Sequence, residues 1–182
     1  GTVYGTPKQI PIPETHDLMP ISAYGISKVM VEKYIQLYHH LHGLDYTIFR
    51  VANAFGEGQN IKSGQGVIGI WLDKAKNGEG LQVWGDGSDT RDYIHAKDIA
   101  KAITAAIIQG EKEEKVFNLG FGKGVSLNEI AQIVQKKVKH KLEINYFEHR
   151  GFDVSHNVLD ISKIKEVYQW QPEISLFEVD TW

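Results

Sequence analysis

Helix-like and strand-like segments alternate along the whole chain, and this order limits the folds that it can adopt. Residues 22–42 carry apolar side chains at spacings of three and four, which is the pattern of one helix face. A β-branched and aromatic run over 46–51 follows and is typical of a strand. Further helices are expected at 66–77, 98–109, 126–139 and 162–169, and further strands at 82–84, 116–119 and 142–146. This alternation predicts an α/β protein.

Segments rich in proline, glycine and asparagine separate these elements. Four of the five prolines lie within residues 6–20, and residues 53–65 are rich in glycine, asparagine and glutamine, so both stretches are expected to be loops. Gly56-Glu-Gly58 and Gly120–Gly124 resemble parts of a dinucleotide-binding loop. That loop belongs in the first βα turn of a βαβ unit, and because neither segment has this position we interpret both as turns.

Composition excludes several kinds of protein. Of the 182 residues, 42% are hydrophobic and 24% are charged, as in globular proteins with a core. The absence of cysteine excludes disulfides and thiolate metal sites and fits a cytoplasmic location. Charges of both signs are mixed along the chain, and no basic stripe indicates a nucleic-acid partner. No apolar run has the length of a bilayer, so we predict no membrane partner. His39-His-Leu-His42 has no further ligand beside it, so we predict no metal site.

Tyr24 and Lys28 are the sharpest chemical signal in the sequence. They stand four residues apart at the start of the first predicted helix, so their side chains are expected to share a face. A phenol is a poor base at neutral pH, but an adjacent ammonium favours the phenolate. The pair can then take a proton from a hydroxyl group. The alternative is an ordinary helix with a surface lysine and a half-buried tyrosine, because Y-x-x-x-K by itself is not specific.

Two further segments suit the binding of phosphates. Arg50-Val-Ala-Asn53-Ala-Phe-Gly56 follows the strand at 46–51, and Arg91-Asp-Tyr-Ile-His95 precedes a helix. In the second segment, the Arg91 guanidinium can donate two parallel bonds to phosphate oxygens and stays charged. Gly66 opens a helix, whose N-terminus presents free N–H groups to an anion. A buried helix cap remains the alternative for Asn53.

Together these motifs resemble the NAD-dependent epimerase/dehydratase family, the extended nucleotide-sugar branch of the short-chain dehydrogenases/reductases. The Y-x-x-x-K pattern follows Val3-Tyr-Gly5 and a proline loop, and residues 50–56 and 91–95 match R-x-x-N-x-[FY]-G and R-D-[YF]-[IV]-[HY]. The resemblance covers roughly residues 1–175 and corresponds to the last three-fifths of the family. It implies an incomplete Rossmann-type doubly wound sheet over 1–60 and a small mixed α/β substrate-binding subdomain over 61–182, with about 92–118 returning to the Rossmann part.

The resemblance also implies the site residues. Tyr24 and Lys28 would act in catalysis and contact NAD, with Val51 as a further cofactor contact. Thr2 is the hydroxyl nearest to the family's catalytic Ser/Thr, whose position would precede Gly1 by one residue. A UDP-sugar would be bound by Asn53, Gly66, Val67, Gln82, Trp84, Arg91, Arg150, Asp153 and Asn157. Trp84 would hold the uracil ring, although a core tryptophan is the alternative, and Arg150-Gly-Phe-Asp153 departs from the family's R-x-G-D order.

The implied reaction is 4-epimerisation of a UDP-hexose of the UDP-glucose/UDP-galactose type. Tyr24 would remove the O4 proton while hydride leaves C4 for NAD, and the 4-keto sugar would turn over before hydride returns. The family dimerises through a bundle that includes the Tyr/Lys helix, so a homodimer is expected for the full-length parent. The modest size of Asn157 would admit N-acetylated sugars.

Two alternatives remain open. A nucleotide-sugar 4,6-dehydratase would carry an acidic pair just before V-Y-G, where this chain has Gly1 and Thr2. A truncated, non-catalytic chain that binds UDP is the alternative of another class, because the family's G-x-x-G-x-x-G loop is absent from this sequence. We expect a preceding segment, and we expect the 182-residue chain alone to be inactive.

Overall fold

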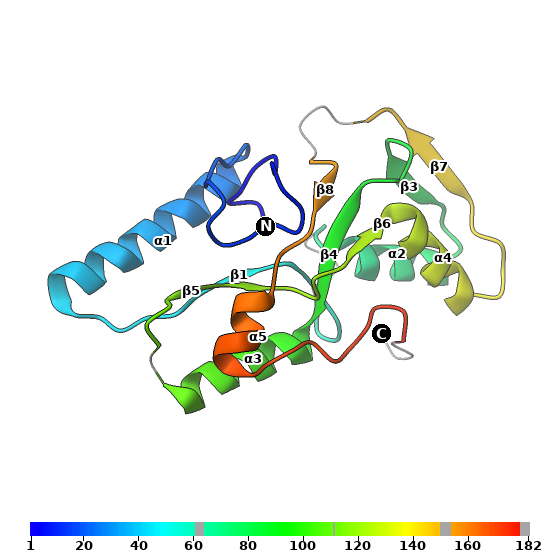
Figure 1. Cartoon of the computed structure of the whole chain (residues 1–182). Helices are drawn as coiled ribbons and strands as arrows, with labels where there is room; N and C mark the ends of the chain where they lie inside the picture. Colours follow the sequence, from blue (N-terminus) through cyan, green and yellow to red (C-terminus); the bar gives the residue numbers. More distant parts are fainter. Residues whose placement is uncertain (61–63, 111, 150–153, 179–182) are drawn as a thin grey trace.

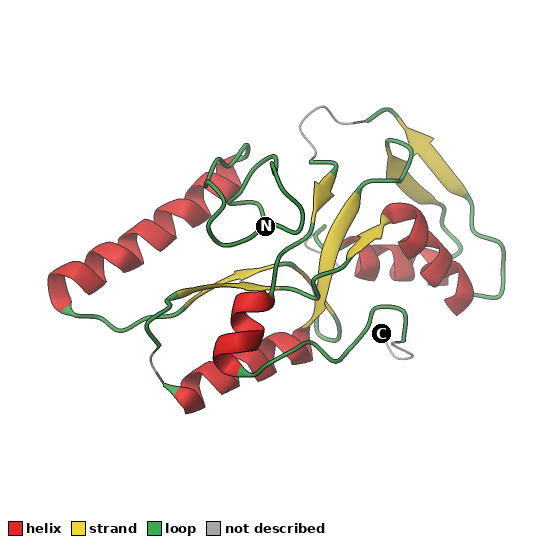
Figure 2. Cartoon of the chain, in the orientation of Figure 1, coloured by secondary structure: helices red, strands yellow, loops and turns green. Residues whose placement is uncertain are grey.

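The computed structural model describes residues 1–60, 64–110, 112–149 and 154–178. Helices and strands alternate along it, which confirms the predicted α/β class (Figure 1, Figure 2). The helices are α1 (Ala23–His42), α2 (Val67–Lys76), α3 (Ala96–Gln109), α4 (Leu127–Lys137) and α5 (Ser162–Tyr168). The strands are β1 (Ile48–Val51), β2 (Asn53–Phe55), β3 (Leu81–Trp84), β4 (Thr90–His95), β5 (Val116–Leu119), β6 (Gly124–Ser126), β7 (Ile144–Phe147) and β8 (His156–Asn157).

Helix α1 has a sequence-encoded start and stop. The Ser22 hydroxyl accepts a hydrogen bond from the Gly25 N–H at 3.1 Å and so satisfies one of the free donors of the first turn. Gly43 adopts a left-handed conformation with φ 67° and donates to the His39 carbonyl, which ends the helix. Only Gly25 and Glu32 of this helix are buried, so most of α1 lies at the surface.

Strand β4 connects two groups of strands. Its last residues pair in parallel with β2, and its first residues pair with β6 antiparallel and with β8 in parallel. The pairs β1–β5 and β3–β7 are both parallel. Figure 1 shows β4 running through the middle of the molecule, with α3 and α5 towards one end and α2 and α4 towards the other.

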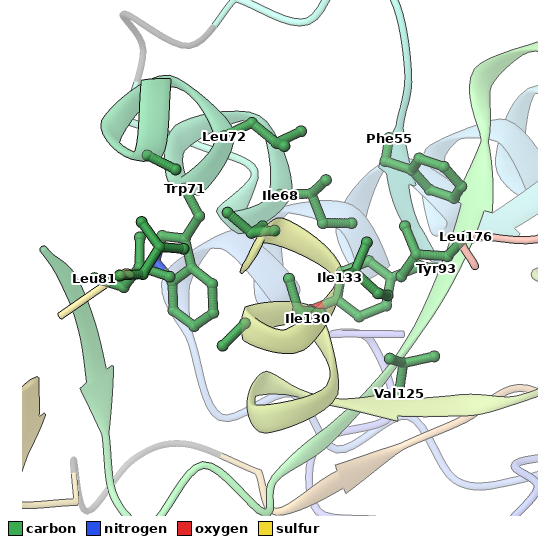
Figure 3. Packing of buried hydrophobic residues seen from close by; sticks show 14 of the residues in the cluster. Phe55, Ile68, Trp71, Leu72, Leu81, Tyr93, Val125, Ile130, Ile133 and Leu176 are labelled. Atoms are coloured by element: carbon green, nitrogen blue, oxygen red, sulfur yellow. The ribbon is translucent and has the colours of Figure 1, made fainter. Parts of the chain in front are cut away.

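Two hydrophobic cores lie on opposite sides of β4. Tyr93 belongs to one cluster and Ile94 to the other, because successive side chains of a strand point to opposite faces. Figure 3 shows the first core, where α2 and α4 pack together over Trp71, Ile68 and Ile130. The second core gathers the N-terminal loop, β5 and α5 around Tyr4, Phe117 and Tyr168. The division into units at residues 1–60 and 61–182 stays a prediction.

Several elements differ from their predicted bounds or were not predicted. Residues 53–55 form β2 although 53–65 was expected to be a loop, and Gly124 begins β6 although Gly120–Gly124 was interpreted as a turn. Strand β7 begins at Ile144 rather than at residue 142, because Leu142 faces the core before the pairing with β3 begins. Strands β4, β6 and β8 are set by long-range pairing with one another, which no local pattern encodes.

Candidate active site

Tyr24 and Lys28 lie on one exposed side of the first turns of α1. The Lys28 ammonium nitrogen lies 5.2 Å from the centroid of the Tyr24 ring. The Tyr24 side chain is 61% exposed, so it is not part of either core, and the alternative of a half-buried tyrosine is wrong. The two side chains therefore share a face, as the four-residue spacing predicts.

Close packing brings the N-terminal segment against this turn. A Cβ at Gly25 would lie 2.7 Å from the Thr2 carbonyl oxygen and 2.8 Å from Pro20 Cβ, so only glycine fits between them. Thr2 thus lies beside the residue that follows Tyr24. Its side chain is exposed, in keeping with a site at the surface rather than in the core.

The same N-terminal segment reaches the predicted substrate residues. A Cβ at Gly1 would lie 2.1 Å from Asn157 Oδ1, and the Gly1 nitrogen donates to the Val51 carbonyl at 3.4 Å. Asn157 in β8 is the register partner of Arg91 in β4. Figure 1 shows the N-terminus between α1 and β8. A continuous series of contacts therefore runs from the Tyr24 turn to Arg91.

Arg91 is held by backbone carbonyl groups. Its Nη1 donates to the Thr90 carbonyl at 3.0 Å and to the Ser155 carbonyl at 3.3 Å. Both of these bonds use the same nitrogen, and the arginine fork has donors on two others. The guanidinium is half-buried at the point where β4 meets β8, so it can present those donors to an anion.

Asn53 lies in strand β2 and not at a helix cap. Its side chain is exposed and hydrogen-bonds the hydroxyl of its register partner, Tyr93. Burial raises the pKa of Tyr93 to about 12, so this hydroxyl stays neutral at physiological pH. The alternative of a buried helix cap for Asn53 is wrong.

Two other predicted groups lie at element ends. Gln82 and Trp84 point outward from β3, and Trp84 is 37% exposed, so the core alternative for Trp84 is wrong. Gly66 precedes α2 with φ 86°, and Val67 begins that helix without a side-chain cap at its N-terminus. Arg150 and Asp153 lie outside the described residues.

The two glycine segments that resemble a dinucleotide loop have packing roles. A Cβ at Gly56 would lie 2.8 Å from His95 Nε2, and a Cβ at Gly120 would lie 2.3 Å from Asp92 Oδ2. The buried Asp92 carboxylate accepts N–H bonds from Phe121, Gly122 and Leu159, at 2.8, 3.1 and 3.3 Å. These glycines make room for buried side chains, which agrees with their interpretation as turns.

Sequence reasoning missed the buried Arg50–Glu32 pair. Arg50 is in β1 and Glu32 is in α1, and both are among the few buried charged residues of the described chain. Glu32 stands four residues after Lys28, so the spacing that identified Tyr24 and Lys28 extends to it. An arginine within an otherwise apolar strand run was the signal for its partner.

Within the described ranges, no group of three or more histidine, aspartate or glutamate side chains is arranged to hold a metal ion. Among the same residues, no helix is both long and apolar enough to cross a bilayer.

Residues 1–120 match the model of the NAD dependent epimerase/dehydratase family. The chain belongs to this family. The predicted family and the partial Rossmann-type fold are thereby confirmed.

Several similar members of the family are epimerases. A candidate UDP-glucose 4-epimerase of Methanocaldococcus jannaschii is 38% identical over 178 residues, which cover 98% of this chain and 57% of that protein. The UDP-glucose 4-epimerase of Thermotoga maritima, solved with UDP-glucose, superposes with a TM-score of 0.91 at 34% identity and with the same two coverages. The UDP-glucose 4-epimerase of Thermus thermophilus, solved with NAD, gives 0.87 at 26% identity and covers 98% of this chain and 58% of that one. The chain therefore spans little more than half the length of these relatives.

Proposed function

We propose that this chain carries the catalytic pair and the substrate side of an NAD-dependent nucleotide-sugar 4-epimerase that interconverts UDP-glucose and UDP-galactose. The observation that carries the proposal is the Lys28 ammonium, 5.2 Å from the centroid of an exposed Tyr24 ring. Membership of a family whose similar members include UDP-glucose 4-epimerases supports it.

Tyr24 is the proposed base. Its phenolate oxygen takes the proton from the sugar O4 and becomes the hydroxyl, and the ammonium of Lys28 stabilises the negative charge that the phenolate carries before the transfer. Thr2 lies beside the same turn and is the proposed hydroxyl partner of the sugar oxygen. Because the proton returns from the tyrosine after the 4-keto sugar has turned, the base is restored at the end of the cycle.

The described residues fit one end of NAD. Tyr24 and Lys28 are exposed and can contact the nicotinamide ribose, and Val51 ends the neighbouring strand β1. Gly56 and Gly120, one from each segment that resembles a dinucleotide loop, are packed against His95 and Asp92, so these two glycines have no free face to offer a pyrophosphate. When bound, NAD supplies the acceptor and donor of the C4 hydride. We propose that a preceding segment of a longer protein holds the rest of it.

The substrate residues divide by the part of the UDP-sugar that they would bind. Arg91 is proposed to bind the diphosphate, together with the N-terminus of α2 at Gly66 and Val67. Asn53 is proposed to add a bond to the same group. Gln82 and Trp84 would contact the uracil. Arg150 would contact a phosphate or the nucleoside, and Asp153 would contact the ribose hydroxyls.

Asn157 is proposed to line the sugar pocket, because its side chain touches Gly1 and lies in register with Arg91. Its modest size supports acceptance of N-acetylated sugars. The further expectations of a homodimer and of a cytoplasmic location for the longer protein belong to the same proposal.

Product analysis tests the reaction class. The longer protein, given UDP-glucose and NAD, is expected to form UDP-galactose. A 4-keto-6-deoxy product would assign it instead to the 4,6-dehydratases. Gly1 and Thr2 argue against this alternative, because neither residue supplies the acid that such a reaction needs.

Calorimetry with the 182-residue chain tests whether this chain binds UDP while a preceding segment binds most of NAD. We expect it to bind UDP, to show no tight binding of NAD and to turn nothing over. Tight NAD binding would contradict the assignment of the cofactor to a preceding segment.

A further inference from the structure

One face of the β3–β7 pair carries two aromatic rings and two carboxamides in register. Gln82 lies opposite Asn145, and Trp84 lies opposite Phe147. All four side chains are exposed, whereas Leu81 and Val83, which alternate with them in β3, are buried in the core. Figure 1 shows β3 and β7 side by side at the edge of the molecule.

The two rings form a matched pair. Their centroids are 5.0 Å apart and their planes differ by 33°. Trp84 is 37% exposed and Phe147 is 41% exposed, so neither ring is buried in the core behind it. Paired aromatic faces at a protein surface are the groups on which nucleobases stack.

One end of this face lies towards Arg91, the residue proposed to bind the diphosphate. His149, two residues after Phe147, lies against Gly85, where a Cβ would be 3.0 Å from its Cδ2. The same histidine contacts Asp89 Oδ2 at 3.2 Å, two residues before Arg91. The order along the surface is therefore rings, turn and guanidinium, which is the order of base, ribose and diphosphate in a nucleoside diphosphate.

We propose that Phe147 is a second base-contacting residue, which with Trp84 forms a two-ring platform for the pyrimidine of the nucleotide sugar, while the Gln82 carboxamide contacts the polar edge of the base. The proposal rests on the proposed function, which by itself assigns the base to β3 alone. The platform extends the base site to β7.

The neighbouring residue provides a matched control. Tyr146 has a similar exposure to Phe147, but its hydroxyl donates to Asn128 Oδ1 in α4 at 2.9 Å, so it points away from the platform. Replacement of Phe147 therefore removes a ring from the platform, whereas replacement of Tyr146 leaves the platform intact.

Calorimetric titration of the 182-residue chain with UDP tests the proposal. Phe147→Leu is expected to weaken UDP binding about tenfold or more, since one base–ring stacking contact is worth that much. Phe147→Tyr is expected to restore it, and Tyr146→Phe is expected to leave it within about twofold. Binding of inorganic pyrophosphate, which has no base, is expected to be the same in all four proteins.

Three results would overturn the platform: UDP affinity unchanged in Phe147→Leu, an equal loss for UDP and pyrophosphate, or UDP bound no more tightly than pyrophosphate by the unchanged chain. A longer protein that binds UDP through Phe147 but forms no UDP-galactose would overturn the epimerase proposal and leave the platform supported. A thermal melt of each variant checks that a loss of binding does not come from unfolding.

Discussion

Arg50 donates to both carboxylate oxygens of Glu32, from Nε at 2.9 Å and from Nη2 at 2.7 Å. This buried pair joins β1 to α1 one helical turn beyond Lys28. Arg50 Nη1 also donates to the Tyr4 hydroxyl at 2.9 Å, which in turn donates to Asn118 Oδ1 at 2.6 Å. Burial raises the pKa of Tyr4 to about 12, so its hydroxyl keeps the proton that this bond needs. The network therefore fixes the helix that carries Tyr24 and Lys28 against the parallel strands.

Glu32→Gln is expected to destabilise the chain by about 3–5 kcal/mol, because it leaves the Arg50 cation buried without its counter-charge. Chemical denaturation measures the loss. Glu57→Gln, which breaks the exposed pair with Lys97, is the control and is expected to change stability by less than about 1 kcal/mol. The double variant Glu32→Met/Arg50→Met is expected to recover much of the loss. Equal effects of Glu32→Gln and Glu57→Gln would contradict the role of the buried pair.

Asp92→Asn is expected to cost about 1–3 kcal/mol, because the amide has one acceptor oxygen where the carboxylate accepts from three N–H groups. Burial raises the pKa of Asp92 above its ordinary value, so the folded state takes up this proton before the unfolded state does. By linkage, the contribution of Asp92 to stability grows as pH falls through the folded pKa. The difference in unfolding free energy between the parent and the variant should therefore widen from pH 7 to pH 4. A constant or shrinking difference would contradict this.

Ser126→Ala is expected to cost about 1 kcal/mol through loss of the cap of α4. The Glu129 carboxylate accepts from both the Ser126 N–H and the Ser126 hydroxyl, each at 2.8 Å, and these bonds lower the pKa of Glu129. A lowered folded pKa gives stability that is present above pH 4.5 and is lost as pH falls through the folded value. The penalty of the variant, measured by denaturation, should therefore shrink in acid. A penalty that grows in acid would argue against the capping box as its source.

The capping box also shows what the sequence can predict. Ser126 and Glu129 lie close together in the sequence, as Ser22 and Gly43 lie next to the ends of α1, so such caps can be predicted from a local pattern of residues three or four positions apart. The family motifs likewise predict roles for Tyr24, Lys28 and Arg91 from the sequence, and these roles stay predictions.

The rest depends on distant residues. Strand β8 has two residues and exists because it pairs with the first residues of β4. The Phe147 ring lies opposite Trp84 only because of the register of β7 with β3, and the sequence of either strand alone does not determine this register. The burial of Arg50 depends on Glu32, from a different element, and no local period encodes that pairing.

Arg91→Lys is expected to weaken UDP binding about tenfold while leaving the chain folded. Lysine keeps the charge but has no planar fork with which to hold the Thr90 and Ser155 carbonyl groups and a phosphate oxygen together. Titration with UDP and with uridine separates the effects, because uridine lacks the diphosphate. An equal loss of affinity for both ligands would show that Arg91 acts on the base or ribose instead.

Tyr24 is the proposed base, whose phenolate removes the proton from the sugar O4. The most direct measurement is the kcat of Tyr24→Phe in the longer protein, with UDP binding measured beside it. We expect a fall in kcat of about 10²–10⁴-fold. We also expect unchanged affinity for UDP, because the ring and its lysine remain and only the proton acceptor is lost. A variant that keeps kcat within a few fold of the parent would contradict the role of Tyr24 as the base.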